Sequence, residues 1–381
     1  MRMSYLPEAE YSHVNKTLGI WPLDEDTVSD EYFAIAFAAP LIIQFAIRFA
    51  KVQVPIYFAV TRQEQLFSSK KVPGRDYFLI FIGGEPFYHL MSFCHRLAAL
   101  PPFCVAIGKN SVQTSFDYKD QDLLQIVKRL CEEDKGLEHI LFPADFDCTM
   151  SNSALAYILG HEIAHITHGH LSFISSAKFK REFVDDEDKY LTLRTLEMDA
   201  DSSGTSLTAE LFENPTTRNH IIGYEIDQSD ELARTRNRYK YIAGIYAAHL
   251  YGDARLKNSD SKKYPDPYTR FLTSKSVLQR CYLLTLKNND LDTAPEEVRD
   301  LLAKTFISMS GRMESLQHPF VYNITLVNDD PSKNIHVYHP LGESKKFEGL
   351  TPLKKRWARI RSDLEHFSVG GNLAPAQADP A

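Results

Sequence analysis

The sequence predicts an α+β protein that combines a small mixed sheet with a larger helical part. Three observations lead to this fold class. The chain has 381 residues, 44% of them apolar, which is enough to bury a large core. Before residue 150, short β-type runs alternate with helix-like segments. After about Ser151, the apolar residues recur with the 3.6-residue period of helices.

Residues 1–150 are expected to form the N-terminal α/β part of the core. The most apolar segment, Tyr32–Ile47, is interrupted by Pro40 and falls short of the roughly 20 clean apolar residues that span a bilayer, so we interpret it as a buried helix. Two more helices are predicted at Pro86–Leu100 and Gln121–Glu133. The runs that predict strands are Val52–Val60, Tyr77–Ile82, Phe103–Ile107 and His139–Phe142.

Residues 151–256 are expected to form the helical part of the core. Two long helices, around 151–171 and 189–210, flank a charged segment at 178–189 that we interpret as a solvated connector. A third helix is predicted at Glu231–Tyr251.

The polar stretch 257–268 is interpreted as a surface loop, and residues 269–367 as a C-terminal subdomain. A Thr-Ala-Pro-Glu sequence at 293–296 has the residue types of a helix start. A hairpin and a final helix complete the subdomain, at Phe320–Val327, Asn334–Tyr338 and Leu353–Phe367. Residues 368–381, which are rich in Gly, Ala and Pro, predict a disordered tail.

The charge pattern excludes several classes of partner. With 43 basic and 50 acidic residues the net charge is −7, and no long basic run is present, so neither nucleic acid nor a membrane is expected to bind. The first residues lack the apolar stretch of a signal peptide. The five cysteines contain no CxxC pair, which favours a reducing compartment, and we expect a cytoplasmic protein.

The segment Gly160–His170, GHEIAHITHGH, contains an HExxH motif within a predicted helix. At about 100° per residue, His161 and His165 lie one turn apart on one face, so both imidazoles can bind one zinc ion. Ala154, Tyr157 and Ile158 are placed on the same face, which is therefore expected to be covered by other parts of the protein. Four solvated histidines on a polar helix fit this apolar context poorly.

Glu162 is the predicted general base. Zinc lowers the pKa of water towards ~7, and a neighbouring carboxylate can accept the proton as that water attacks a carbonyl and return it to the leaving amine. The donor that would stabilise the oxyanion cannot be chosen from the sequence, which offers His220, Tyr224, Arg236, Arg238, Tyr241, Tyr246 and His249.

A third zinc ligand must come from elsewhere in the chain. The pattern HExxHxxGxxH is excluded, because His168 and Leu171 occupy the positions of its glycine and its last histidine. Downstream, Glu197 begins the sequence EMDADSSG, and we predict it as the third ligand. Asp199, or a residue outside this segment, is the alternative.

Small residues on the same downstream helix support this interpretation. Ala200 and Gly204 lie on the face of Glu197 and would let the two helices approach closely. Asp201, on that face as well, can accept a ring N–H from a ligand histidine and fix its tautomer.

The two remaining histidines of the motif region are not predicted to be ligands. Three ligands from one straight helix cannot surround a tetrahedral ion, so His168 is expected to form a hydrogen bond or contact the substrate. His170 is expected to point away, and Gly169 to loosen the end of the helix. No role is assigned to either residue.

The motif pair GHEIAHITHGH and LEMDADSSG resembles that of the gluzincin peptidases, which join HExxH to ExxAD and include the HtpX-type and CAAX-processing enzymes. The resemblance spans about sixty residues. It implies a zincin-like core with His161, His165 and Glu197 as zinc ligands, Glu162 as base and Asp201 behind the ligands. Those enzymes cross the membrane several times, whereas this chain has no convincing span.

The chain also resembles the soluble Lit-type phage-exclusion peptidases, which cleave a translation elongation factor. That resemblance rests on the motif, the soluble character and the central position of the motif. It implies a role in phage defence, with the elongation factor as substrate only by analogy.

We therefore expect a zinc-dependent endopeptidase that acts on a protein substrate. A non-catalytic zinc-containing interaction or regulatory module is the main alternative, and hydrolysis of a non-peptide amide is another. Glu162 favours catalysis, because a structural zinc site needs no base and is normally closed by four protein ligands.

Overall fold

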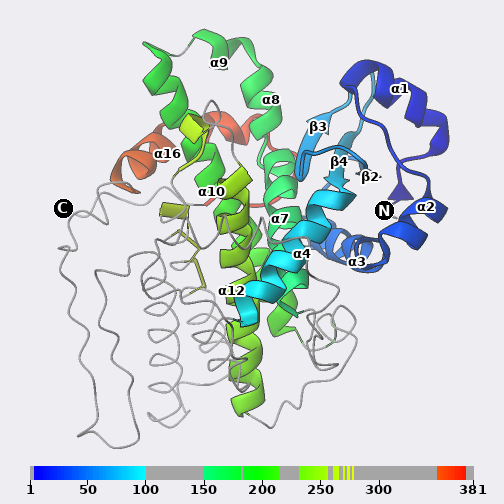
Figure 1. The fold of residues 1–381 in the computed structure, drawn as a ribbon. Coiled ribbons are helices and arrows are strands. Elements are labelled where there is room, and N and C mark those ends of the chain that lie inside the picture. Colours follow the sequence, from blue (N-terminus) through cyan, green and yellow to red (C-terminus); the bar gives the residue numbers. More distant parts are fainter. Residues whose placement is uncertain are drawn as a thin grey trace, which may run out of the picture.

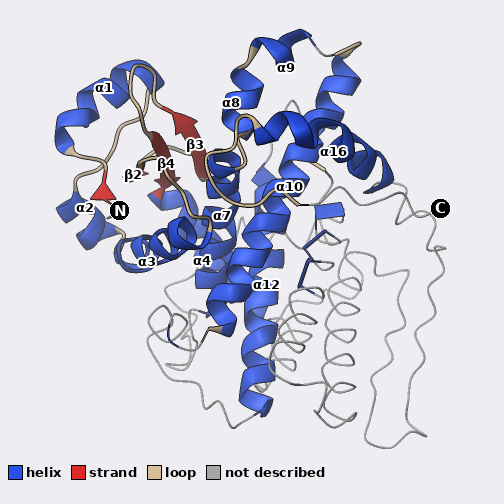
Figure 2. Ribbon diagram, turned by 180° about the vertical axis from the view of Figure 1, so that it is seen from behind, coloured by secondary structure: helices blue, strands red, loops and turns tan. Residues whose placement is uncertain are grey.

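The computed structural model describes residues 4–99, 149–181, 183–214, 216, 231–255, 261–265, 269–270, 273–274, 277–278 and 350–374. Figures 1 and 2 show this part of the chain from opposite sides. A small sheet occupies one side, and long helices occupy the centre.

The sheet contains four strands. They are β1 (Ser4–Tyr5), β2 (Ile56–Thr61), β3 (Phe67–Lys71) and β4 (Phe78–Gly83), in the spatial order β1-β2-β4-β3. Strands β1, β2 and β4 are parallel, and β3 pairs antiparallel with β4. A small mixed sheet beside many helices agrees with the predicted α+β class.

The sheet is covered on both faces, because successive side chains of a strand point in opposite directions. Phe58 of β2 and Ile80 of β4 belong to the large core that also contains helices. Ala59 and Leu79, each the direct neighbour of one of these residues in its strand, pack in a smaller core with Val14 of α1 (Glu8–Leu18). Because both faces of β2 and β4 are buried, their sequences are apolar at nearly every position.

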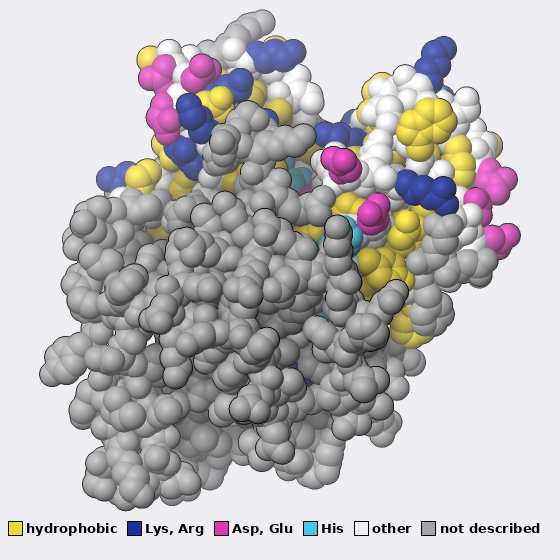
Figure 3. Space-filling view, viewed as in Figure 1, with side chains coloured by type: hydrophobic (Ala, Val, Ile, Leu, Met, Phe, Trp, Pro, Cys, Tyr) yellow, Lys and Arg dark blue, Asp and Glu magenta, His cyan; other side chains and the backbone are white. Residues whose placement is uncertain are grey.

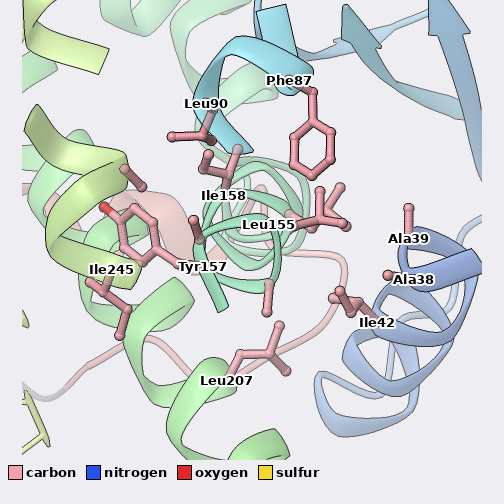
Figure 4. Close-up of a cluster of buried hydrophobic side chains, with 14 of the residues drawn as sticks. Ala38, Ala39, Ile42, Phe87, Leu90, Leu155, Tyr157, Ile158, Leu207 and Ile245 are labelled. Carbon is pink, nitrogen blue, oxygen red and sulfur yellow. The ribbon is translucent and has the colours of Figure 1, made fainter. Parts of the chain in front are cut away.

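Helix α7 (Thr149–Thr167) runs through the centre of the fold (Figure 1). Every one of its residues is buried except Glu162. A helix that is apolar on all sides must be surrounded by other elements. Figure 4 shows Leu155, Ile158 and Tyr157 projecting from α7 in different directions, towards α3 (Phe33–Phe49), α4 (Gly84–Ala99) and α12 (Glu231–Arg255) respectively.

Helix α10 (Asp186–Glu213) packs against α7 at a glycine contact. A Cβ on Gly204 would lie 2.6 Å from the carbonyl oxygen of Tyr157 and 2.9 Å from the amide nitrogen of His161. A Cβ on Gly160 would lie 3.0 Å from the Cα of Gly204. The backbones of α7 and α10 therefore lie in close contact, as predicted from the small residues Ala200 and Gly204.

Helix α12 packs against α7 from another side in the same way. A Cβ on Gly244 would lie 1.9 Å from Oγ of Ser153 and 2.2 Å from the carbonyl oxygen of Met150. Ser153 Oγ also donates a hydrogen bond to the carbonyl oxygen of Tyr241 at 3.1 Å. Glycine contacts thus fix α7 between α10 and α12.

The end of the chain returns to the centre of the molecule. Helix α16 (Leu350–Glu365) places Trp357 in a core with Phe173 of α8 (His170–Ser175) and Leu196 of α10. Beyond it, the amide of Val369 donates to the carbonyl oxygen of Thr167 at 2.9 Å. Our prediction of a disordered tail from Ser368 is therefore wrong for residues 368–374, because backbone hydrogen bonds at the end of α7 hold them.

The charged segment 178–189 is largely exposed, as we predicted for a solvated connector, but part of it is helical. Helix α9 (Ala177–Arg181) lies inside it, and α10 begins at Asp186. The side chain of Asp185 accepts the amide of Asp188 at 2.8 Å, and three acidic residues fill the first turn of α10. These negative charges cap the N-terminus of α10 and interact favourably with the positive end of its dipole, and they do not mark a loop.

The other predicted elements are found within a few residues where the structure describes them, apart from the first residues of Val52–Val60, which precede β2. The short helices α2 (Glu25–Glu31) and η2 (Ser261–Lys263) were not predicted, nor were β1, β3 and α1. The predicted elements Phe103–Ile107, Gln121–Glu133, His139–Phe142, the helix at 293–296, Phe320–Val327 and Asn334–Tyr338 lie outside the described residues. The domain division stays a prediction.

Within the described ranges, no helix has the length and apolar character that crossing a membrane requires. Helix α3, the most apolar one, contains Pro40 and packs Ile35 and Ile42 into the large core.

Gly204→Ala is expected to destabilise the protein by about 1–3 kcal/mol, because the new methyl group would meet rigid backbone atoms of α7. Gly252→Ala on α12 is the matched control. A Cβ there meets nothing within 4 Å, so the change should leave stability equal or raise it by up to about 1 kcal/mol. Urea unfolding of both variants measures the difference, and equal midpoints would refute the close helix contact.

Candidate metal centre

The three predicted ligands lie together on α7 and α10. Nε2 of His161 lies 3.0 Å from Nε2 of His165. One carboxylate oxygen of Glu197 lies 3.2 Å from the first nitrogen, and the other lies 3.5 Å from the second. The side chains are between 9% and 16% exposed, so the site is nearly closed to solvent.

These separations fit a zinc ion. With zinc–ligand bonds of about 2.1 Å, neighbouring ligands of a tetrahedral ion lie about 3.4 Å apart. Oε2 of Glu197 is buried and has no hydrogen-bond partner among the residues that the structure describes. A buried carboxylate oxygen without a partner is costly, and a cation between these three groups would remove that cost. His161, His165 and Glu197 can therefore hold the metal that the motif implies.

Asp201 lies behind His161, as the sequence predicts. Its Oδ1 lies 2.9 Å from Nδ1 of His161. With Nε2 directed at the ion position, Nδ1 carries the proton and donates to Asp201, which fixes the ring orientation. Burial lowers the pKa of His161, but its interactions with Asp201 and Glu197 outweigh burial and raise that pKa to about 10.

Arg270 anchors Asp201 and was not anticipated from the sequence. Its Nε and Nη2 donate to the two carboxylate oxygens of Asp201 at 2.8 and 2.7 Å. The hydroxyl of Tyr157 donates to Asp201 as well. Although burial opposes ionisation, the charge of Arg270 holds the pKa of Asp201 well below its usual value.

The network continues away from the ligands. The ring of His249 lies edge-on to that of Tyr157, and its Nε2 lies 3.0 Å from Oγ of Ser274. Burial lowers the pKa of His249 to about 3, so this ring is neutral at pH 7. Among the oxyanion donors considered from the sequence, His249, Tyr241 and Tyr246 are buried within the helices. His249 packs against Tyr157, which in turn donates to Asp201.

A second group of polar side chains lies next to His165. His168, His170 and Asp199 are buried, and their possible ligand atoms lie within 4.8 Å of one another. Nδ1 of His168 lies 2.5 Å from Oδ2 of Asp199. His168 therefore forms the hydrogen bond that we expected, while Asp199 faces this group and lies apart from the predicted ligands.

His170 corrects one expectation. We predicted that it points away from the motif, but its Nδ1 lies 3.0 Å from Nδ1 of His165. Gly169 is the reason: its φ of +78° ends α7 and turns the chain, so that α8 starts at His170 in a new direction. Burial lowers the pKa of His170 to about 4. Helical periodicity could not predict this turn, because it gives the directions of side chains only within one continuous helix.

Glu162 occupies a distinct position on α7. It is the one residue of this helix with partial exposure, and it follows the ligand His161 directly. A carboxylate at this place can reach solvent and remain beside the ligands without binding the ion itself.

Comparison with known proteins finds one family to which part of the chain is similar. The sequence profile of the Peptidase U49 family, which comprises Lit-type metallopeptidases, matches residues 148–280, about a third of the chain. No curated protein and no solved structure matches the chain. The matched region includes α7, α10 and α12, and with them Glu162, Glu197 and Arg270. The similarity to this family supports a peptidase.

Arg270→Gln is expected to lower the free energy of unfolding by roughly 3–5 kcal/mol at pH 7, because Asp201 would stay buried without its charged partner. A carboxylate whose pKa is depressed in the folded state stabilises the protein above its unfolded pKa of about 3.9, and this contribution disappears as the pH falls through the folded value. The gap between wild type and variant should therefore narrow below about pH 4. Urea unfolding at several pH values measures it.

Arg361→Gln is the matched control. Arg361 pairs with Glu365 at 2.6 Å, but both side chains are substantially exposed, so the loss should stay below about 1 kcal/mol. A comparable loss in both variants would contradict an anchoring role for Arg270.

Proposed function

We propose that the protein is a zinc-dependent endopeptidase that cleaves a protein substrate. The observation that carries this proposal is the triangle formed by His161, His165 and Glu197, with edges of 3.0–3.5 Å, beside the partly exposed Glu162. The similarity to the Peptidase U49 family supports the same reaction class.

The residues of the site divide into holding and reacting groups. His161, His165 and Glu197 would hold the ion, and Asp201 with Arg270 would keep His161 in one tautomer and orientation. Zinc in such a site supplies a Lewis acid and makes water acidic near neutral pH. Glu162 would accept a proton from the attacking water and deliver it to the departing amine.

A substrate segment would have to approach from the surface near the ligands. Figure 3 shows a recess between the lobe with α8 and α9 and the lobe with the sheet, and histidine surface is visible inside it. Counted as whole residues, His161 and His165 are 7% and 8% exposed, so little of either is accessible through this opening. An extended peptide fits such an opening better than a folded protein surface, which supports cleavage within a loop or terminus of the substrate.

We further propose a role in phage defence, with cleavage of a host translation component such as an elongation factor. The support is the similarity to Lit-type peptidases alone. A cytoplasmic location accompanies this proposal.

The alternative of a non-catalytic zinc module is disfavoured by the number of ligands. A structural zinc site is normally closed by four protein ligands, whereas the described residues bring three together at this position. Glu162 would also have no function in such a module.

Glu162→Gln should reduce cleavage by about 10²–10⁴-fold and leave zinc content unchanged, because the amide keeps the size of the side chain but accepts no proton. New protein termini in cells that express each form, together with zinc per chain, provide the measurement. Glu210→Gln, at an exposed position of α10, is the matched control and should retain cleavage. Full cleavage by the Glu162 variant would refute the mechanism.

Zinc added to the metal-free protein should raise its stability by about 2.7 kcal/mol when the free ion reaches 100 times its dissociation constant. His165→Ala should lose most of this gain, since one of three ligands is missing. Thermal unfolding with and without zinc measures the effect. An unchanged gain in the variant would show that the ion binds elsewhere.

A further inference from the structure

The buried group behind His165 can be assigned a function from its proton positions. His168, His170 and Asp199 are 5%, 0% and 3% exposed, so solvent supplies them with almost no hydrogen bonds. Among the described residues, their polar atoms lie against one another and against His165. The pairwise distances therefore restrict where each proton can be.

The contact between His165 and His170 is the first restriction. A neutral imidazole carries its proton on one of two nitrogens. When Nε2 of His165 binds a metal ion, its proton is on Nδ1. Nδ1 of His170, 3.0 Å away, must then be the acceptor, because two N–H groups cannot face each other at that distance. The proton of His170 is accordingly on Nε2.

Asp199 completes the chain of contacts. Nε2 of His170 faces Oδ2 of Asp199 at 3.2 Å, and within the described part of the chain this buried nitrogen has no hydrogen-bond partner. The approach is an electrostatic contact and not a well-aligned hydrogen bond. The negative charge of this carboxylate oxygen still favours a proton on Nε2 of His170. His168 donates to the same oxygen from Nδ1 at 2.5 Å and keeps Asp199 in place.

We infer that His170 and Asp199 are positioning residues for His165, which they hold in the tautomer and orientation that binds the metal. This inference rests on the proposed function only in so far as His165 is a metal ligand. Each ligand histidine then has its own carboxylate. Asp201 contacts His161 directly, whereas Asp199 acts on His165 through the ring of His170.

His168, His170 and Asp199 could instead hold a second metal ion. The proton positions derived above argue against such an ion. An ion on Nε2 of His170 would move the proton to Nδ1, where it would oppose the N–H of a metal-bound His165. The 2.5 Å separation between Nδ1 of His168 and Oδ2 of Asp199 is also much shorter than the roughly 3.4 Å between neighbouring zinc ligands. The first site and a second ion are therefore mutually exclusive.

The test compares three forms of the full-length protein loaded with zinc or cobalt(II). His170→Leu removes the acceptor with little change in volume, and His170→Asn retains an oxygen near the position of Nδ1. We expect one zinc per chain in the wild type, a 10–100-fold weaker zinc affinity in His170→Leu, and recovery to within a few-fold in His170→Asn. Urea unfolding of each metal-free form shows whether it is folded.

Proton NMR of the cobalt(II) form supplies a readout that packing alone would not change. The wild type should show two slowly exchanging, strongly shifted N–H signals, one from each ligand histidine. His170→Leu should lose one of them, because the Nδ1 proton of His165 no longer has an acceptor. His249→Leu, which removes another buried histidine that contacts neither ligand ring by hydrogen bond, should keep the signal that His170→Leu loses.

Three outcomes would overturn the inference: two zinc ions per chain in the wild type, equal zinc affinity in His170→Leu and wild type, or an unchanged pair of N–H signals in His170→Leu. These readouts do not involve proteolysis. One zinc per chain with the expected spectra but no cleavage would defeat the proposed function and leave the positioning role intact, whereas no zinc at all would defeat both.

Discussion

The close contact between α7 and α10 is the constraint on which the site depends. His161 and His165 come from one helix and Glu197 from the other, so three ligands meet only if the two backbones touch. Gly160 and Gly204 provide that contact, and any larger side chain would meet backbone atoms of the opposite helix. The burial of almost all of α7 by α3, α4 and α12 keeps the ligand helix from moving.

The tightly packed centre of the protein also contains buried charged groups. Charged groups are rarely buried unless they are paired, and here Asp201 is paired with Arg270 and His161, while Asp199 lies against His168 and His170. Each carboxylate is thus kept ionised by cationic or N–H neighbours. The resulting arrangement fixes the ring of one ligand histidine directly and that of the other through a further ring.

The end of the chain contributes to the same region. Residues 368–371 bind the carbonyl oxygens of Thr167 and Ala50, and Gly371 lies so close to His168 that a Cβ would be 3.0 Å from its ring. The turn from α7 into α8, where His168 and His170 lie, is therefore covered by a segment about 200 residues away in the sequence. Solvent is kept from the polar group behind His165 partly by this segment.

The sequence by itself determined the helices of the site, the HExxH spacing and the placement of Glu197, because helical periodicity is a local property. Strand β3, with the sequence FSSKK, was invisible, since it is defined by pairing with β4. Only the tertiary structure decided that Arg270 anchors Asp201, that His170 turns back to His165, and that residues 368–374 are ordered. Each depends on a contact between distant segments or on the left-handed backbone at Gly169, and no local pattern encodes such contacts.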